Sequence, residues 1–124
     1  MKKLLTLSAI IEAATGLGLL VAPAALARLL LGGTLDTPAA VTVGRVAGTA
    51  LVALGVACWL AASDAQSCAA KRVVSAMVIY NLGAALVLGA TGITSQLAGV
   101  GLWPAVLLHT AMTVWCLRVK RKKG

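Results

Sequence analysis

Residues 39–62 read AAVTVGRVAGTALVALGVACWLAA, a run of 24 residues in which Arg45 is the only charged side chain. An α-helix needs roughly 20 apolar residues to cross the hydrocarbon core of a bilayer. Three more apolar segments follow the same pattern, at residues 4–31, 73–93 and 97–117. The sequence therefore predicts an all-α fold, an integral membrane four-helix bundle with a single transmembrane domain.

The composition agrees with this interpretation. Hydrophobic residues make up 60% of the chain and charged residues 11%, whereas soluble domains carry about 25% charged residues. The net charge of +8 is expected to sit at membrane edges, because short loops cannot display the folded basic face that nucleic acid needs. Three cysteines without a CxxC motif or a Cys/His cluster predict neither a disulfide framework nor a metal site.

The first apolar segment is too long for one crossing. Its 28 residues would extend about 42 Å as a helix, against a hydrocarbon core of roughly 30 Å. Pro23 lies inside it, and proline breaks a helix interior but is tolerated in a first turn. We therefore predict spans at residues 4–22, 39–62, 73–93 and 97–117 within domain 1–124, and a short interfacial helix from Pro23 to the Gly32-Gly33 pair, with Arg28 reaching the headgroups.

Basic residues indicate the orientation. Nine of them lie at the predicted N-terminus, the loop between the second and third spans, and the C-terminus: Lys2, Lys3, Lys71, Arg72, Arg118, Lys120, Arg121, Lys122 and Lys123. The two opposite loops contain none. Because short cytoplasmic loops are enriched in lysine and arginine, we predict a multi-pass protein of a bacterial-type inner (plasma) membrane with both termini inside.

A secretory signal is the competing interpretation of the N-terminus. Lys2-Lys3, the apolar run and Ala25-Leu26-Ala27 imitate a signal peptide with a small-residue cleavage site. Cleavage would leave three spans and an external N-terminus. Glu12 inside the apolar run argues against it.

Polar groups form a predicted layer inside the spans. Glu12, Asn81 and His109 each lie eight residues from the cytoplasmic end of their span, which corresponds to a depth of about 12 Å, and Tyr80 is one residue shallower. Such a layer is typical of a structural hydrogen-bond cluster, but ionisable groups at this depth are also candidates for function, including proton transfer by Glu12. We expect His109, on an antiparallel helix, to be the partner of Glu12.

Arg45 is expected to point away from Glu12, because helical side chains lean towards their own N-terminus. It would contact an anion, cap carbonyls or snorkel at the outer face. Gly44 and Gly48 form a GxxxG motif that Gly55 extends, and this pattern predicts close helix packing within the bundle, or else a contact with a membrane protein partner or a second copy. No residue stands out as catalytic, and no cofactor is expected; haem b on His109 is a further alternative.

The segment Ser8-Ala9-Ile10-Ile11-Glu12-Ala13 resembles the first helix of the small multidrug resistance transporters. The resemblance implies that Glu12 would be a shared proton and substrate site in an antiparallel dimer. The strong loop bias departs from that family, since dual insertion requires a weak one. Residues 47–61 and 102–109 resemble small bacterial membrane proteins of unassigned function.

These observations favour a non-enzymatic accessory, assembly or binding module of the membrane. Loops of at most about ten residues cannot build an active site outside the bilayer, so an enzyme is disfavoured. The alternatives are a proton-coupled small-molecule transporter that uses Glu12 and a haem b-binding redox subunit that uses His109.

Overall fold

The computed structural model describes residues 1–122, which form five α-helices. α1 is Lys2–Val21, α2 is Pro23–Leu31, α3 is Pro38–Ser63, α4 is Cys68–Thr94 and α5 is Leu102–Arg121. All except α2 are long and apolar enough to cross a membrane. The predicted all-helical bundle of four long helices is confirmed, while Lys123, counted among the basic residues, lies outside the described residues.

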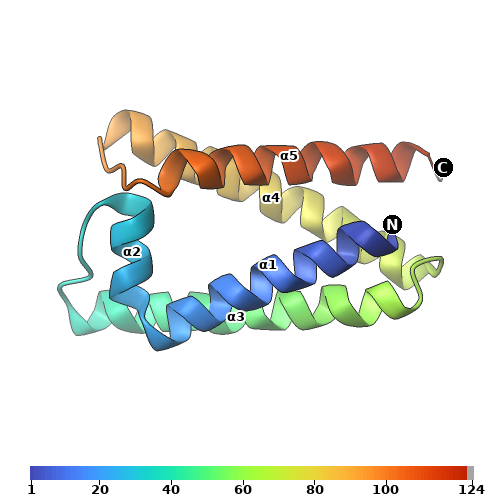
Figure 1. The fold of residues 1–124 in the computed structure, drawn as a ribbon, viewed down its shortest axis with the longest axis horizontal. Coiled ribbons are helices and arrows are strands. Elements are labelled where there is room, and N and C mark those ends of the chain that lie inside the picture. The colour runs from blue at the N-terminus through green and yellow to red at the C-terminus, as the bar shows by residue number, and fades with distance from the viewer. Residues whose placement is uncertain (123–124) are drawn as a thin grey trace.

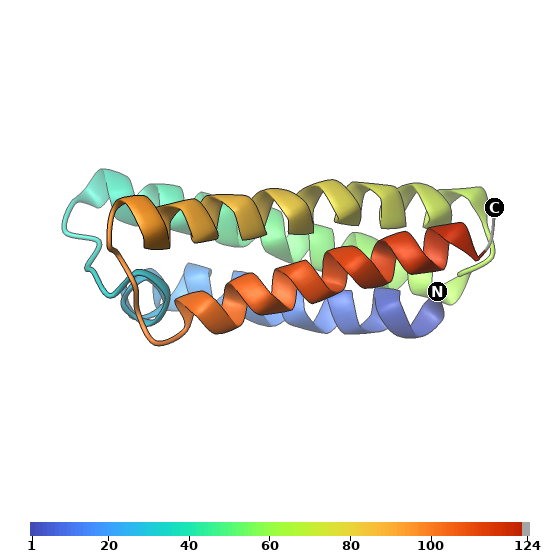
Figure 2. The same ribbon diagram turned by 90° about the horizontal axis from the view of Figure 1, so that it is seen from above.

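The four long helices form two antiparallel hairpins. α1 packs along α3, and α4 packs along α5, whereas contacts between the hairpins are sparser (Figures 1 and 2). The N-terminus, residues 64–67 and the last turn of α5 lie at one end, which we call the terminal end. α2 and the loops 32–37 and 95–101 lie at the other, which we call the α2 end. The basic residues of the predicted cytoplasmic side that the structure describes therefore gather at one end of the bundle.

The break predicted at Pro23 is present. α1 ends at Ala22, whose φ of −137° and ψ of 61° are not helical, and α2 begins with Pro23. α2 then runs across the bundle (Figure 1) and ends at Gly32, whose φ of 68° is left-handed, a conformation that glycine adopts without steric cost.

The loop between α4 and α5 is bonded to the end of α2. The backbone N–H groups of Gly99 and Gly101 donate to the carbonyls of Leu30 and Leu29 at 3.0 and 2.8 Å. Helix ends leave carbonyls without intrahelical partners, and this loop satisfies two of them. The contact also explains why α5 begins at Leu102, five residues after the predicted start at residue 97.

α4 begins earlier than predicted. The Ser67 hydroxyl accepts the N–H of Ala70 at 3.1 Å, which is an N-cap arrangement, so the helix starts at Cys68 rather than residue 73. Lys71 and Arg72 consequently lie among the first five residues of the helix and not in a loop. Both remain exposed at the terminal end.

Packing between the two hairpins is tightest near the terminal end. A core there unites all four long helices and consists of Leu4, Leu5, Ala9, Cys58, Ala62, Ala70, Val74, Met77, Met112 and Cys116. Towards the α2 end, none of residues 82–94 of α4 or 103–111 of α5 is buried. Between the two hairpins the bundle is therefore closed in one half and loosely packed in the other, although α1 and α3 stay in close contact there at Gly16 and Gly48 and Leu102 is buried.

Candidate functional site

The predicted polar residues meet between the two hairpins. Glu12 comes from α1, Tyr80 and Asn81 from α4, and His109 from α5. Glu12 is 3% exposed and Asn81 1% exposed, while Tyr80 and His109 are half-buried. We call these four residues the polar layer.

Hydrogen bonds connect the members of the polar layer. The Nδ1 of His109 lies 2.8 Å from the Oδ1 of Asn81, and the Nδ2 of Asn81 donates to the Met77 carbonyl at 2.8 Å. The rings of Tyr80 and His109 meet edge to face, with centroids 5.6 Å apart. The Tyr80 hydroxyl interacts with the Glu12 carboxyl, so this contact links one hairpin to the other.

The partner of Glu12 differs from the expectation. His109 was expected to be that partner, but its polar contacts are with α4, and Tyr80 stands as the hydrogen-bond partner of Glu12. Neither α4 nor α5 packs closely on α1, and the phenol of Tyr80 is the longer of the two side chains, so it can reach across this wider spacing. Within residues 1–122, no basic side chain forms an ion pair with Glu12.

Ser8 is a member of this region that sequence reasoning missed. It lies one helical turn from Glu12, on the same face of α1, and is 1% exposed. Its Oγ is buried without a hydrogen-bond partner among the described residues. The four-residue spacing between Ser8 and Glu12 was the signal that could have identified it.

The polar layer lies where the packing changes. On its terminal side is the apolar core of residues such as Leu5, Cys58 and Met77. On its other side lie Gly16 of α1 and Gly48 of α3, and beyond these two glycines no residue of α1 or α3 is buried. The buried carboxyl thus sits at the floor of the loosely packed half.

Arg45 is separate from the polar layer. It is exposed on α3, and its backbone carbonyl accepts the Thr49 hydroxyl at 3.1 Å. Gly44 and Gly48, which face α1, α2 and the loop before α3, are on a different side of the helix. Arg45 therefore lies apart from Glu12, and its contact with an anion or with the outer face stays a prediction.

The glycines of α3 serve the packing of the first hairpin. A Cβ at Gly48 would lie 2.7 Å from the Gly16 carbonyl oxygen, and one at Gly55 would lie 3.0 Å from that of Ala9. A Cβ at Gly44 would meet only side chains, of Leu35 and Pro23, at 3.4 Å. Gly48 and Gly55 therefore require the absence of a side chain, whereas Gly44 has more room.

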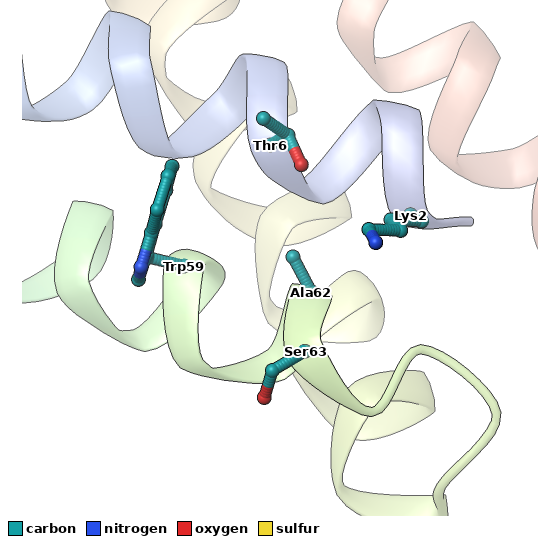
Figure 3. A pocket seen from close by; sticks show the side chains of 5 residues that line it. All are labelled: Lys2, Thr6, Trp59, Ala62 and Ser63. Carbon is teal, nitrogen blue, oxygen red and sulfur yellow. The ribbon is translucent and has the colours of Figure 1, made fainter.

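A hollow, separate from the polar layer, lies at the terminal end between α1 and α3. It has a volume of about 350 Å³ and is lined by Lys2, Thr6, Trp59, Ala62 and Ser63. Figure 3 shows the Trp59 ring extending from α3 towards α1, with Thr6 and Lys2 further along. An amphipathic aromatic side chain beside a lysine is a combination typical of membrane interfaces.

The candidate site offers proton-transfer and hydrogen-bonding groups rather than a metal centre. Residues 1–122 contain no group of three or more His, Cys, Asp or Glu side chains that could hold a metal, and Cys58, Cys68 and Cys116 are free thiols.

Neither the scan against family models nor the searches of curated proteins and solved structures found a match.

Proposed function

We propose that the chain is a four-span protein of a bacterial-type inner (plasma) membrane with both termini in the cytoplasm. The support is the length and apolar character of α1, α3, α4 and α5, together with the exposed basic residues gathered at the terminal end. That end faces the cytoplasm in this proposal, because lysine and arginine are enriched there. α2 lies along the outer interface.

In that membrane we propose a non-enzymatic accessory, assembly or binding module. The observation that carries this proposal is the polar layer, in which Glu12, Tyr80, Asn81 and His109 use one another as partners and link the two hairpins. Polar groups in lipid are stabilised by such contacts. A layer of this kind fixes how the hairpins sit and leaves the loosely packed half to accept a ligand or a membrane protein partner.

A proton-coupled small-molecule transporter is the second candidate. It is favoured by the position of Glu12, whose buried carboxyl has a phenol as partner and lies at the boundary between the closed and the loosely packed half. Buried carboxyls in membrane proteins often form proton relays. Movement of the hairpins about this boundary would change the side from which Glu12 is reached.

Reporter fusions test the placement. A reporter after Gly124 should be active as a cytoplasmic fusion, and one inserted near Gly33 as an external fusion. A C-terminal fusion that reads external would overturn the orientation. These results do not depend on any ligand, so they separate the placement from the binding role.

Glu12→Gln separates the two candidate functions. Gln keeps the shape and a hydrogen bond to Tyr80 but cannot exchange a proton, so a transporter should lose proton-coupled uptake while its stability stays unchanged. Asp64→Asn removes an exposed carboxyl at the terminal end and is the matched control. If wild-type proteoliposomes show no proton release with a panel of cations and metabolites, and Glu12→Gln is also silent, the transporter candidate is eliminated.

The visible spectrum tests the haem b alternative. His109 supplies one imidazole, whose Nδ1 is held by Asn81, and a second copy would have to supply the other axial ligand. The accessory or binding role predicts a purified protein without a Soret band. A Soret band that disappears in His109→Ala would replace the proposed function by a redox one.

A further inference from the structure

An apolar groove occupies the loosely packed half of the bundle. It has a volume of about 390 Å³, and its lining includes Leu19 of α1, Ala27 and Leu30 of α2, Val43 of α3 and Leu88 of α4. Its volume is in the range of small-molecule sites, about 300–1,000 Å³. We call it the α2 groove.

The α2 groove lies between the hairpins and is open to the outside, since Val43 in its lining is 68% exposed. Leu19 lies seven residues beyond Glu12, and Leu88 seven residues beyond Asn81. Seven residues are two helical turns, so each leucine shares a helix face with its polar residue, roughly 10 Å further towards the α2 end. The groove therefore continues the space between the hairpins on the far side of Gly16 from the terminal core.

The size of the groove limits what can fill it. A helix with its side chains is about 10–12 Å across, so a space of about 390 Å³ would hold roughly a single helical turn. A span from a second copy or from a partner protein is too wide. A single flexible hydrocarbon chain is much narrower, and every residue that lines the groove is apolar.

The charge beside the groove indicates the headgroup of such a chain. Arg28 follows Ala27 on α2 and is exposed, and no acidic side chain pairs with it among residues 1–122. Asp36, in the loop after α2, is bonded to the Thr34 hydroxyl. Arginine binds phosphate oxygens through its planar guanidinium, so an anionic phosphate headgroup complements this edge of the groove.

We propose that the α2 groove binds one hydrocarbon chain of an anionic phospholipid, with Arg28 contacting the phosphate of that lipid. The inference rests on the proposed membrane placement and gives the binding module a ligand class. Because α2 would lie at the outer interface, the lipid enters sideways from the outer leaflet.

Native mass spectrometry of the full chain tests the proposal. The protein is reconstituted in nanodiscs containing phosphatidylglycerol and phosphatidylcholine, released into detergent and measured for retained lipid. Wild type should keep one phosphatidylglycerol per chain. Leu88→Trp, which fills the groove, should lower retention about tenfold, while Val87→Trp, at the exposed neighbouring position, should retain lipid as wild type does.

Two arginine variants test the headgroup. Arg28→Gln should retain a lipid but lose the preference for phosphatidylglycerol, whereas Arg72→Gln, exposed at the terminal end, should leave the preference unchanged. Equal retention by Leu88→Trp and Val87→Trp would overturn the proposal, as would a second copy of the chain in place of the lipid. Thermal melts of each variant show whether it is folded, and the reporter fusions show separately whether the membrane placement holds.

Discussion

The Oδ1 of Asn81 on α4 faces the Nδ1 of His109 on α5 at a separation of 2.8 Å. The Nδ2 of Asn81 is occupied in donating to the Met77 carbonyl, so the oxygen must be the atom that faces the imidazole. His109 therefore carries a hydrogen on Nδ1 and donates it to Asn81. The backbone of α4 thus sets the tautomer of a side chain on α5.

Asn81→Leu should destabilise the bundle by about 1–3 kcal/mol, because it leaves the buried Nδ1–H of His109 without an acceptor. Unfolding of the detergent-solubilised protein by SDS measures this change. His109→Leu combined with Asn81→Leu should cost less than the sum of the two single changes, with a coupling of about 0.5–3 kcal/mol. Additive effects of the two changes would contradict a direct bond.

The polar layer could be predicted from residue counts alone. Straight antiparallel helices rise about 1.5 Å per residue, so residues equally far from the same end of the bundle lie at one depth. The pairing within the layer could not be predicted in this way. It depends on how each helix is rotated, and helices that are apolar on all sides carry no periodic signal of that rotation. The sequence therefore could not show that Tyr80, rather than His109, lies beside Glu12.

Gly48→Ala should cost about 1–3 kcal/mol, the usual effect of overpacking. The new methyl group would lie 2.7 Å from the Gly16 carbonyl oxygen and 2.9 Å from the Cβ of Leu19, and α1 would have to move away. Thermal unfolding in detergent measures the loss. Gly83→Ala is the matched control, because nothing lies within 4 Å of a Cβ there, and alanine favours a helix.

The GxxxG motif indicated close packing, but it did not identify the partner helix. Gly48 and Gly55 pack on Gly16, Ala9 and Ala13 of α1, whereas the motif alone was compatible with a contact to a second copy.

The residue at which α5 starts could not be predicted from the sequence either. Residues 97–101 are largely apolar, so the sequence predicts a helix there. The backbone bonds that hold this segment as a loop are made with Leu29 and Leu30, and they depend on where α2 lies.

Gly99→Ala should loosen the α2 end while leaving the terminal core intact. A Cβ at this position would collide with the backbone carbonyl oxygens of Arg28 and Leu29, so the loop would have to move away from α2. Hydrogen exchange at the amides of Gly99 and Gly101 should then become faster. Exchange at Met77, in the terminal core, should not change, and faster exchange there would show that the whole bundle had been disturbed.

Ser8→Ala should leave the stability unchanged or increase it by up to about 1–3 kcal/mol, because it removes a buried hydroxyl that has no partner. Among the described residues, Ser8 is the one whose buried side-chain oxygen lacks a hydrogen bond, and it is one turn from Glu12.

Ser75→Ala is the control for Ser8→Ala. Ser75 is half-buried in α4, and its hydroxyl donates to the Lys71 carbonyl at 3.1 Å. Because that bond would be lost, Ser75→Ala should lower the stability slightly, by about 0.5–1.5 kcal/mol. A loss of stability in Ser8→Ala at least as large as the loss in Ser75→Ala would mean that the Ser8 hydroxyl does have a polar partner in the membrane. The nearest ionisable group on the same face of α1 is Glu12, so the combined change Ser8→Ala with Glu12→Gln would then show whether that partner is shared with the carboxyl.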